Sequence, residues 1–164
     1  MFETIPTDPG TPIRILFVCR ANICRSPLAE AIFTSRVAAA GLSEQIVTGS
    51  AGVALWHIGS PPHSRVLAML SANGIEYAHT ARLFGPADLS SWDYLLAMDN
   101  DVLRSIWAVG RASAKVQPFV KYAPNRKVDE IPDPMKTGEF SQVYDLISSS
   151  CDALLASLRR QYQL

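Results

Sequence analysis

The sequence predicts an α/β fold in which a parallel sheet is covered by helices on both faces. Strand-like and helix-like segments alternate along the chain, and this alternation is typical of parallel sheets. A chain of 164 residues, 48% of them apolar, is long enough to bury one hydrophobic core, which favours a single domain. Residues 1–12 contain three prolines and show little periodicity. We therefore predict an irregular N-terminal lead-in followed by one domain over residues 13–164.

The first predicted strand covers residues 13–19. Its last five residues are all apolar, as expected for a strand that is buried on both faces. A helix is predicted over residues 26–40, with Ser26 as its cap, Pro27 at its first position and Gly41 closing it. The residues between the strand and this helix therefore form a short loop at a helix N-terminus.

The remaining elements continue the alternation. Strands are predicted near 45–49, 94–98 and 115–119, and helices near 61–73, 100–108 and in the last part of the chain. The last helix carries an apolar stripe in which residues are three and four positions apart: Phe140, Val143, Tyr144, Ile147, Cys151, Leu154, Leu155 and Leu158. Cys151 lies on this stripe, so we expect it to pack in the core.

The loop after the first strand has a cysteine at one end and an arginine at the other. Backbone N–H groups and the positive end of the helix dipole attract phosphate at such a position, and Arg25 can bind two phosphate oxygens at once. The same field favours the thiolate form of Cys19, and Ser26 can donate its hydroxyl to that sulfur. The loop is therefore interpreted as a phosphate-binding loop that contains a nucleophile.

Two other interpretations of these cysteines are open. An apolar strand that ends in cysteine is often purely structural, since a free thiol behaves as a small hydrophobic group. Cys19 and Cys24, together with His57 and His63, also loosely match the spacing of a zinc site. The position of Cys19 at a strand end and the lack of a glycine-rich knuckle argue against zinc. We expect no metal and no cofactor, and we expect both histidines at the surface.

Composition excludes several function classes. Fifteen basic and fifteen acidic side chains cancel, so the chain has no overall basic field for nucleic acid. No apolar run approaches the ~20 residues that span a bilayer, so no membrane insertion is expected. Three cysteines, an odd number, fit a reducing cytoplasm better than a secreted disulfide scaffold.

Two motifs resemble those of a known family. The run from Ile15 to Glu30, with Cys-Arg-Ser-Pro at 24–27, is similar to the signature of the low-molecular-weight protein tyrosine phosphatases. Ile131-Pro132-Asp133-Pro134 resembles the Asp-Pro loop of that family, and the likeness extends from about residue 13 to residue 160. The resemblance implies a doubly wound domain with a four-stranded parallel sheet, in agreement with the four strands predicted above. It also implies hydrolysis of protein phosphotyrosine through a phosphocysteine intermediate.

The resemblance assigns roles to individual residues. It implies that Cys19 is the nucleophile, that Arg25 binds phosphate and that Asp133 is the general acid and then the general base. Asn22 tolerates the left-handed backbone conformation that such a loop needs. By resemblance, Ser50 and His79 join Ser26 in holding Asn22. Asp99 follows a strand and is expected to support the site.

The walls of the site are where the sequence departs from the family pattern. The resemblance places Trp56 on one wall, whereas the other wall has Met135 in place of the usual aromatic residue. Arg20 and Ala21 replace a small apolar residue and a glycine, and we expect Arg20 to favour acidic sequence around the phosphotyrosine. The residues expected to contact substrate are Arg20, Ala21, Asn22, Ile23, Cys24, Ser26, Trp56 and Met135. Cys24 is also expected to form a reversible disulfide with Cys19 that protects the nucleophile.

Three alternative functions remain open. Protein arginine phosphatases share the scaffold but typically carry threonine where Ile23 stands. Arsenate reductases of the same fold need a relay of resolving cysteines, for which this chain offers only Cys24 and Cys151. A catalytically silent phosphoprotein-binding module is the third. The expected partner is a phosphotyrosine-containing protein, with tyrosine kinases among the candidates.

Overall fold

A single parallel sheet organises the computed structural model, which describes residues 10–124 and 127–164. Its strands are β1 (Ile13–Cys19), β2 (Ile46–Gly52), β3 (Tyr94–Ala97) and β4 (Lys115–Pro118). Their order in the sheet is β2-β1-β3-β4, and every neighbouring pair is parallel. The α/β fold with a four-stranded parallel sheet is thereby confirmed. The lead-in predicted over 1–12 lies largely outside the described residues.

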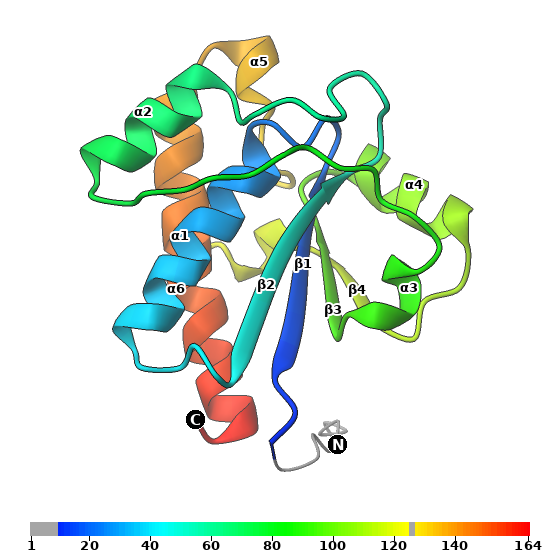
Figure 1. Cartoon of the computed structure of the whole chain (residues 1–164), viewed down its shortest axis with the longest axis vertical. Coiled ribbons are helices and arrows are strands. Elements are labelled where there is room, and N and C mark those ends of the chain that lie inside the picture. The colour runs from blue at the N-terminus through cyan, green and yellow to red at the C-terminus, as the bar shows by residue number, and fades with distance from the viewer. Residues whose placement is uncertain (1–9, 125–126) are drawn as a thin grey trace.

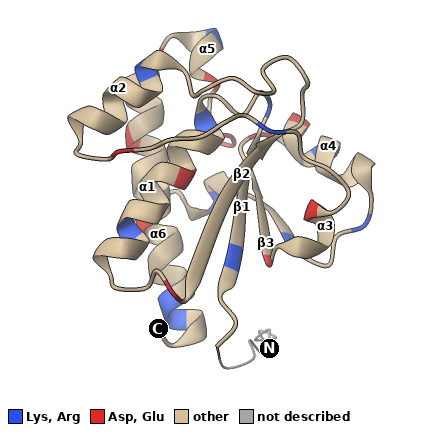
Figure 2. Cartoon of the chain, in the orientation of Figure 1, with Lys and Arg blue, Asp and Glu red and all other residues tan. Residues whose placement is uncertain are grey.

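Helices cover both faces of the sheet, with α1 and α6 on one side and α3 and α4 on the other (Figure 1). The helical elements are α1 (Arg25–Ala39), α2 (Ser64–Ala72), α3 (Asp88–Ser91), α4 (Asn100–Val109), the 3-10 helix η1 (Phe119–Tyr122), α5 (Pro134–Thr137) and α6 (Phe140–Tyr162). None of the helices within the described ranges has the length and hydropathy that crossing a bilayer requires. Basic and acidic residues are interspersed along the helices (Figure 2).

The central strand β1 supplies side chains to both halves of the core. Ile15 and Phe17 pack with α1 and α6, whereas Leu16 and Val18 pack on the opposite face. Phe17 makes edge-to-face contacts with Phe33 and Phe119, at ring distances of 5.7 and 5.2 Å. Burial on both faces is the physical reason why the last five residues of β1 are all apolar.

Two helix starts differ from the sequence prediction. The first helix begins at Arg25, so Ser26 lies inside α1 and does not cap it. The second begins at Ser64, where the Nδ1 atom of His63 accepts a hydrogen bond from the backbone of the helix. Pro62 explains the delay, because the residue before a proline is pushed out of the helical conformation. His63 is half-buried and acts as a cap, contrary to the expected surface position.

Three short elements were not predicted. α3, η1 and α5 have four residues each, which is too short for a helical periodicity to show in the sequence. Two strands also end at residues other than those predicted, since β2 extends to Gly52 and β3 ends at Ala97.

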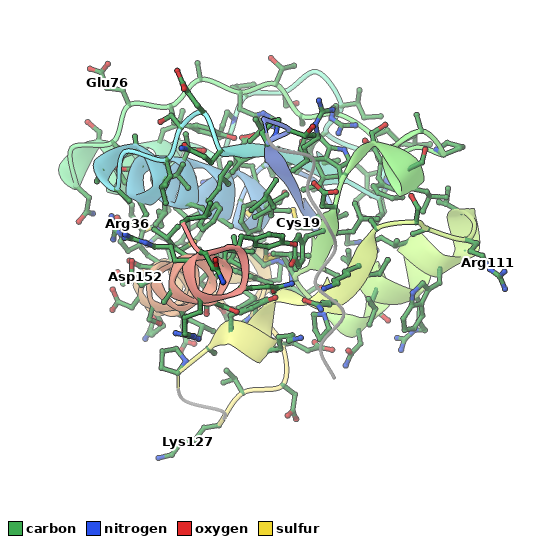
Figure 3. All side chains as sticks on the ribbon, turned by 90° about the horizontal axis from the view of Figure 1, so that it is seen from below. Cys19, Arg36, Glu76, Arg111, Lys127 and Asp152 are labelled. Carbon is green, nitrogen blue, oxygen red and sulfur yellow. The ribbon has the colours of Figure 1, made fainter. Side chains whose placement is uncertain are left out.

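The long helix α6 is anchored against α1. Cys151 is fully buried on its apolar stripe, and its Sγ contacts the carbonyl oxygen of Ala29 at 3.7 Å. Burial raises the pKa of the Cys151 thiol well above its usual range. At the surface, Asp152 accepts a hydrogen bond from Arg36 Nε at 2.9 Å, and both residues are labelled in Figure 3. Cys151 therefore packs in the core, as its place on the stripe predicts.

Candidate active site

The candidate site lies at the carboxyl edge of the sheet, where the loop after β1 leads into α1 (Figure 1). Ligands bind at this edge in open parallel sheets. Cys19 is the last residue of β1 and pairs with Gly52, the last residue of β2. Its side chain lies near the middle of the molecule, whereas Glu76, Arg111 and Lys127 project from the periphery (Figure 3).

Two hydrogen-bonding groups converge on the sulfur of Cys19. The backbone N–H of Asn22 donates to Sγ at 3.2 Å, and the Oγ atom of Ser26 lies 2.9 Å from Sγ. Cys19 is only 3% exposed, so solvent does little to compete with these partners. A sulfur that is held by such groups at a helix N-terminus is suited to nucleophilic attack.

Asn22 holds the loop in a conformation that few residues adopt. Its φ is 57°, in the left-handed region, and its side chain is completely buried. Nδ2 donates to Ser26 Oγ at 2.8 Å and to Ser50 Oγ at 3.0 Å. Oδ1 accepts from the backbone N–H of Arg82 at 3.0 Å and contacts His79 Nε2 at 2.8 Å. The structure thus brings Ser26, Ser50 and His79 together around Asn22.

Arg25 is buried and held from two sides. Its Nη1 donates to Asp99 Oδ2 at 2.8 Å and to the carbonyl oxygen of Ile131 at 3.0 Å. Burial acts to raise the pKa of Asp99, but hydrogen bonds from the backbone of Val102 and from Arg25 outweigh it and hold that pKa below its usual range. Asp99, which follows β3, therefore lies beside the site and holds the Arg25 side chain.

Asp133 faces Arg25 from the start of α5. Its Oδ2 lies 3.9 Å from Arg25 Nη2, and its Oδ1 accepts a hydrogen bond from the backbone of Met135 at 3.0 Å. Pro134 occupies the first turn of α5, where its fixed φ suits the helix. This cap orients the carboxylate, with one oxygen bound to the helix and the other on the side of Arg25.

These groups line a cavity of about 200 Å³. Its lining residues are Cys19, Arg20, Ala21, Ile23, Cys24, Arg25, Trp56, His57, Asp133, Met135 and Lys136. His57 was expected at the surface but is half-buried on the wall beside Trp56. Lys136 was not predicted as a site residue, because a single lysine after Met135 has no distinguishing sequence signal.

The rim of the cavity is aromatic and cationic. The guanidinium of Arg20 lies over the Trp56 ring, 4.6 Å from its centroid, which is the distance of a cation–π contact. Trp56 is 67% exposed and Met135 is 53% exposed. Exposed side chains at the mouth of a pocket are available to a substrate, so the rim offers apolar surface and positive charge together.

Cys24 lies on the same loop as Cys19 but in a different environment. Burial, together with the neighbouring Cys19 and Asp133, raises the pKa of the Cys24 thiol to about 12. Cys24 is therefore a protonated thiol at neutral pH. No group of three or more His, Cys, Asp or Glu side chains suited to a metal ion occurs in the part of the chain that the structure describes.

Comparison with known proteins identifies the family. The model of the low molecular weight phosphotyrosine protein phosphatases matches residues 14–164. The chain belongs to this family. The phosphatase YfkJ of Bacillus subtilis is 39% identical, over 93% of this chain and 99% of its own length. The pig low molecular weight phosphotyrosine protein phosphatase is 35% identical, over 88% of this chain and 95% of its own.

Solved structures of the family superpose closely on this fold. The crystal structure of Bacillus subtilis YfkJ has a TM-score of 0.90 at 38% identity and covers 94% of this chain and 99% of that chain. A Drosophila arginine phosphatase has a TM-score of 0.84 at 30% identity and covers 90% of this chain and 98% of that chain. The family resemblance drawn from the loop after β1 and from the Asp-Pro motif is confirmed.

We predict that Gly52→Ala impairs the loop although Gly52 does not line the cavity. A Cβ at this position would lie 2.8 Å from the carbonyl oxygen of Arg20 and 3.0 Å from Asn22 Cβ. The loop has to move to relieve this contact, and we expect kcat/KM for p-nitrophenyl phosphate to fall by about tenfold to a hundredfold. The control is Gly85→Ala, where a Cβ meets nothing within 4 Å. Equal kcat/KM for the two variants would contradict the prediction.

Proposed function

We propose that this protein hydrolyses phosphotyrosine in proteins through a phosphocysteine intermediate. The observation that carries the proposal is that Cys19 Sγ, the Arg25 guanidinium and the Asp133 carboxylate line one small cavity at a helix N-terminus. A nucleophile, an anion-binding group and a proton donor in one cavity are the parts that phosphate ester hydrolysis needs. Membership of the phosphotyrosine protein phosphatase family supports the same conclusion.

Phosphate binding follows from the way Arg25 is fixed. Asp99 and the carbonyl oxygen of Ile131 both hold Nη1, which sets the plane of the guanidinium and leaves Nη2 on the side of Asp133. A pre-oriented guanidinium loses little entropy when it binds two phosphate oxygens. The backbone N–H groups of the loop and the dipole of α1 add to the attraction of the dianion.

The chemistry then proceeds in two transfers. The thiolate of Cys19 attacks phosphorus, an S–P bond forms and the P–O bond to tyrosine breaks, while Asp133 gives its proton to the leaving phenolate oxygen. In the second transfer Asp133, now a carboxylate, takes a proton from water as the water oxygen bonds to phosphorus. The S–P bond breaks, inorganic phosphate leaves and the thiolate of Cys19 is restored.

The cavity walls favour an aromatic phosphoester. Trp56 and Met135 both line the cavity and present exposed apolar surface, against which a phenyl ring can pack. Ile23, buried beside them, offers no hydroxyl to the leaving group of phosphoarginine. We infer that phosphotyrosine proteins are the substrates, with tyrosine kinases among the candidates, and that the reduced thiol of Cys19 requires a compartment such as the cytoplasm.

Three alternative functions are tested in the same experiment. The Drosophila arginine phosphatase has the same fold at 30% identity, so phosphoarginine has to be tested. An arsenate reductase relay requires accessible cysteines, and Cys151 is completely buried in α6. A binding module that does not turn over is the third outcome.

The first prediction from the proposed function concerns catalytic activity. Wild type is expected to hydrolyse p-nitrophenyl phosphate and phosphotyrosine peptide, and to turn over phosphoarginine and arsenate with thiol far more slowly. Cys19→Ser is expected to lose activity to background, while Asp133→Ala keeps binding but loses about a hundredfold or more in kcat for phosphotyrosine peptide. Failure of wild type to hydrolyse any substrate would support the binding module, and preference for phosphoarginine or arsenate would support the corresponding alternative.

The second prediction concerns Arg20. Since its guanidinium is exposed at the rim beside Trp56, it can attract acidic residues that flank the phosphotyrosine. An exposed charge pair of this kind is worth about 0.5–1 kcal/mol, so Arg20→Ala is expected to reduce the kcat/KM ratio of acidic to neutral phosphopeptides by about twofold to fivefold. Arg65→Ala, which removes another guanidinium placed over an aromatic ring at 4.3 Å, is the control. An unchanged ratio in Arg20→Ala would refute this role.

The third prediction concerns Cys24 under oxidation. Peroxide oxidises the Cys19 thiolate to sulfenic acid and is itself reduced to water, and the Cys24 thiol then condenses with it, releasing water and forming the disulfide. We expect mass spectrometry to find the disulfide between Cys19 and Cys24 in wild type and sulfinic acid on Cys19 in Cys24→Ser. Sulfinic acid on Cys19 of wild type with Cys24 still free would contradict the mechanism.

A further inference from the structure

Three neighbouring side chains, those of His79, Tyr77 and Glu30, connect Asn22 to α1. The hydroxyl of Tyr77 donates to Glu30 Oε2, and the Nδ1 atom of His79 lies 3.9 Å from that same oxygen. The rings of Tyr77 and His79 are stacked, with centroids 5.7 Å apart and planes inclined by 18°. Glu30 and His79 are both largely buried, with side chains 14% and 12% exposed. The catalytic steps proposed above use none of these three residues directly.

The Nε2 atom of His79 must carry a proton. Asn22 donates through Nδ2 to two serine hydroxyls, and its Oδ1 accepts from the backbone of Arg82. This pattern fixes the orientation of the amide, so Oδ1 is an acceptor. His79 Nε2, which lies 2.8 Å from Oδ1, therefore has to donate. A neutral imidazole has one N–H, so Nδ1 must be unprotonated whenever His79 is neutral.

A carboxylate near Nδ1 works against this arrangement. An unpaired Glu30 oxygen would attract the ring proton to Nδ1 and leave two acceptors, Nε2 and Asn22 Oδ1, facing each other. Tyr77 prevents this competition by donating to the Glu30 oxygen that lies nearest to Nδ1. We propose that Tyr77 is a positioning residue that keeps the ring proton of His79 on Nε2, and thereby keeps the loop of Cys19 in place.

The charges around His79 are consistent with a neutral ring. Burial lowers the pKa of His79 and outweighs the opposing effect of Glu30, while the positive charge of Arg82 lowers it further. The other groups that face the ring are the phenol of Tyr77 and the side chains of Asn22 and Ser50. Burial and the nearby Glu30 raise the pKa of Tyr77 well above its usual range, so the phenol remains a donor across the working pH range.

The tautomer can be measured in the wild-type protein without substrate. We expect the ¹⁵N chemical shifts of His79 at about pH 8 to show a protonated Nε2 and an unprotonated Nδ1. A protonated Nδ1 at that pH would overturn the proposal. The kinetic consequence rests on the proposed phosphatase function, whereas this spectroscopic result is independent of it and would stand even if no phosphoester were hydrolysed.

The variant Tyr77→Phe tests the hydroxyl while keeping the stacked ring. The pKa of His79 is expected to rise, because Glu30 is then free to stabilise the imidazolium. We expect kcat/KM at about pH 8 to fall by about fivefold, as for the loss of one hydrogen bond. At about pH 5 the loss is expected to be smaller, because a doubly protonated ring donates from Nε2 in either protein.

Two further variants separate positioning from packing. Tyr122→Phe removes a hydroxyl that bonds Gln117 outside the cavity and is expected to leave His79 and kcat/KM unchanged. In a Glu30→Gln background, Tyr77→Phe is expected to cause no further rise in the pKa of His79. A pH-independent loss of activity in Tyr77→Phe, with the pKa and tautomer of His79 unchanged, would show that Tyr77 only packs.

Discussion

The site depends on the four hydrogen bonds that hold the side chain of Asn22. A non-glycine residue with φ of 57° is strained unless its surroundings compensate. Here the compensation comes from α1, β2 and the segment that precedes α3, through Ser26, Ser50 and His79. The left-handed turn directs the Asn22 N–H to the sulfur of Cys19. The geometry around the Cys19 sulfur is therefore set by contacts outside the loop as well as within it.

Charge balance around Arg25 is the second constraint on the site. A buried guanidinium needs partners, and Asp99 and the Ile131 carbonyl supply them at Nη1. Cys19, Asp99 and Asp133 together raise the pKa of Arg25 although burial opposes them. The fixed negative charge of Asp99 balances the charge of the guanidinium. Under the proposed function, the N-terminus of α1 and Arg25 together would attract a phosphate dianion, and the site does not have to store an unpaired buried cation.

The features that could be predicted from the sequence are those that depend on residues close together in the chain. Continuous apolar residues identified β1, and a cysteine and an arginine around a helix start identified the loop, because each depends on neighbours in the chain. The place of His57 was missed because it depends on how the segment after β2 runs along Cys19 and Arg20, to which Val53 and Ala54 are hydrogen-bonded. The start of α2 was missed because the second of two prolines overrides a favourable Ser-Pro pair. The contact between Arg25 and Asp99 joins residues that are 74 positions apart in the sequence, and no local sequence pattern predicts a contact over such a separation.

Interior and rim residues of the site face different physical demands. Trp56 and Met135 are more than half exposed, so replacing them changes little in the folded core and their chemistry is free to follow the substrate. Asn22, Arg25 and Ser26 are buried and hydrogen-bonded, so a change at any of them leaves buried polar groups unpaired. Tyr77 lies between these two groups, since it is half-buried and reaches the loop through Glu30, His79 and Ser50. A residue in that position can tune the hydrogen bonding of the loop without disturbing the groups proposed to contact phosphate.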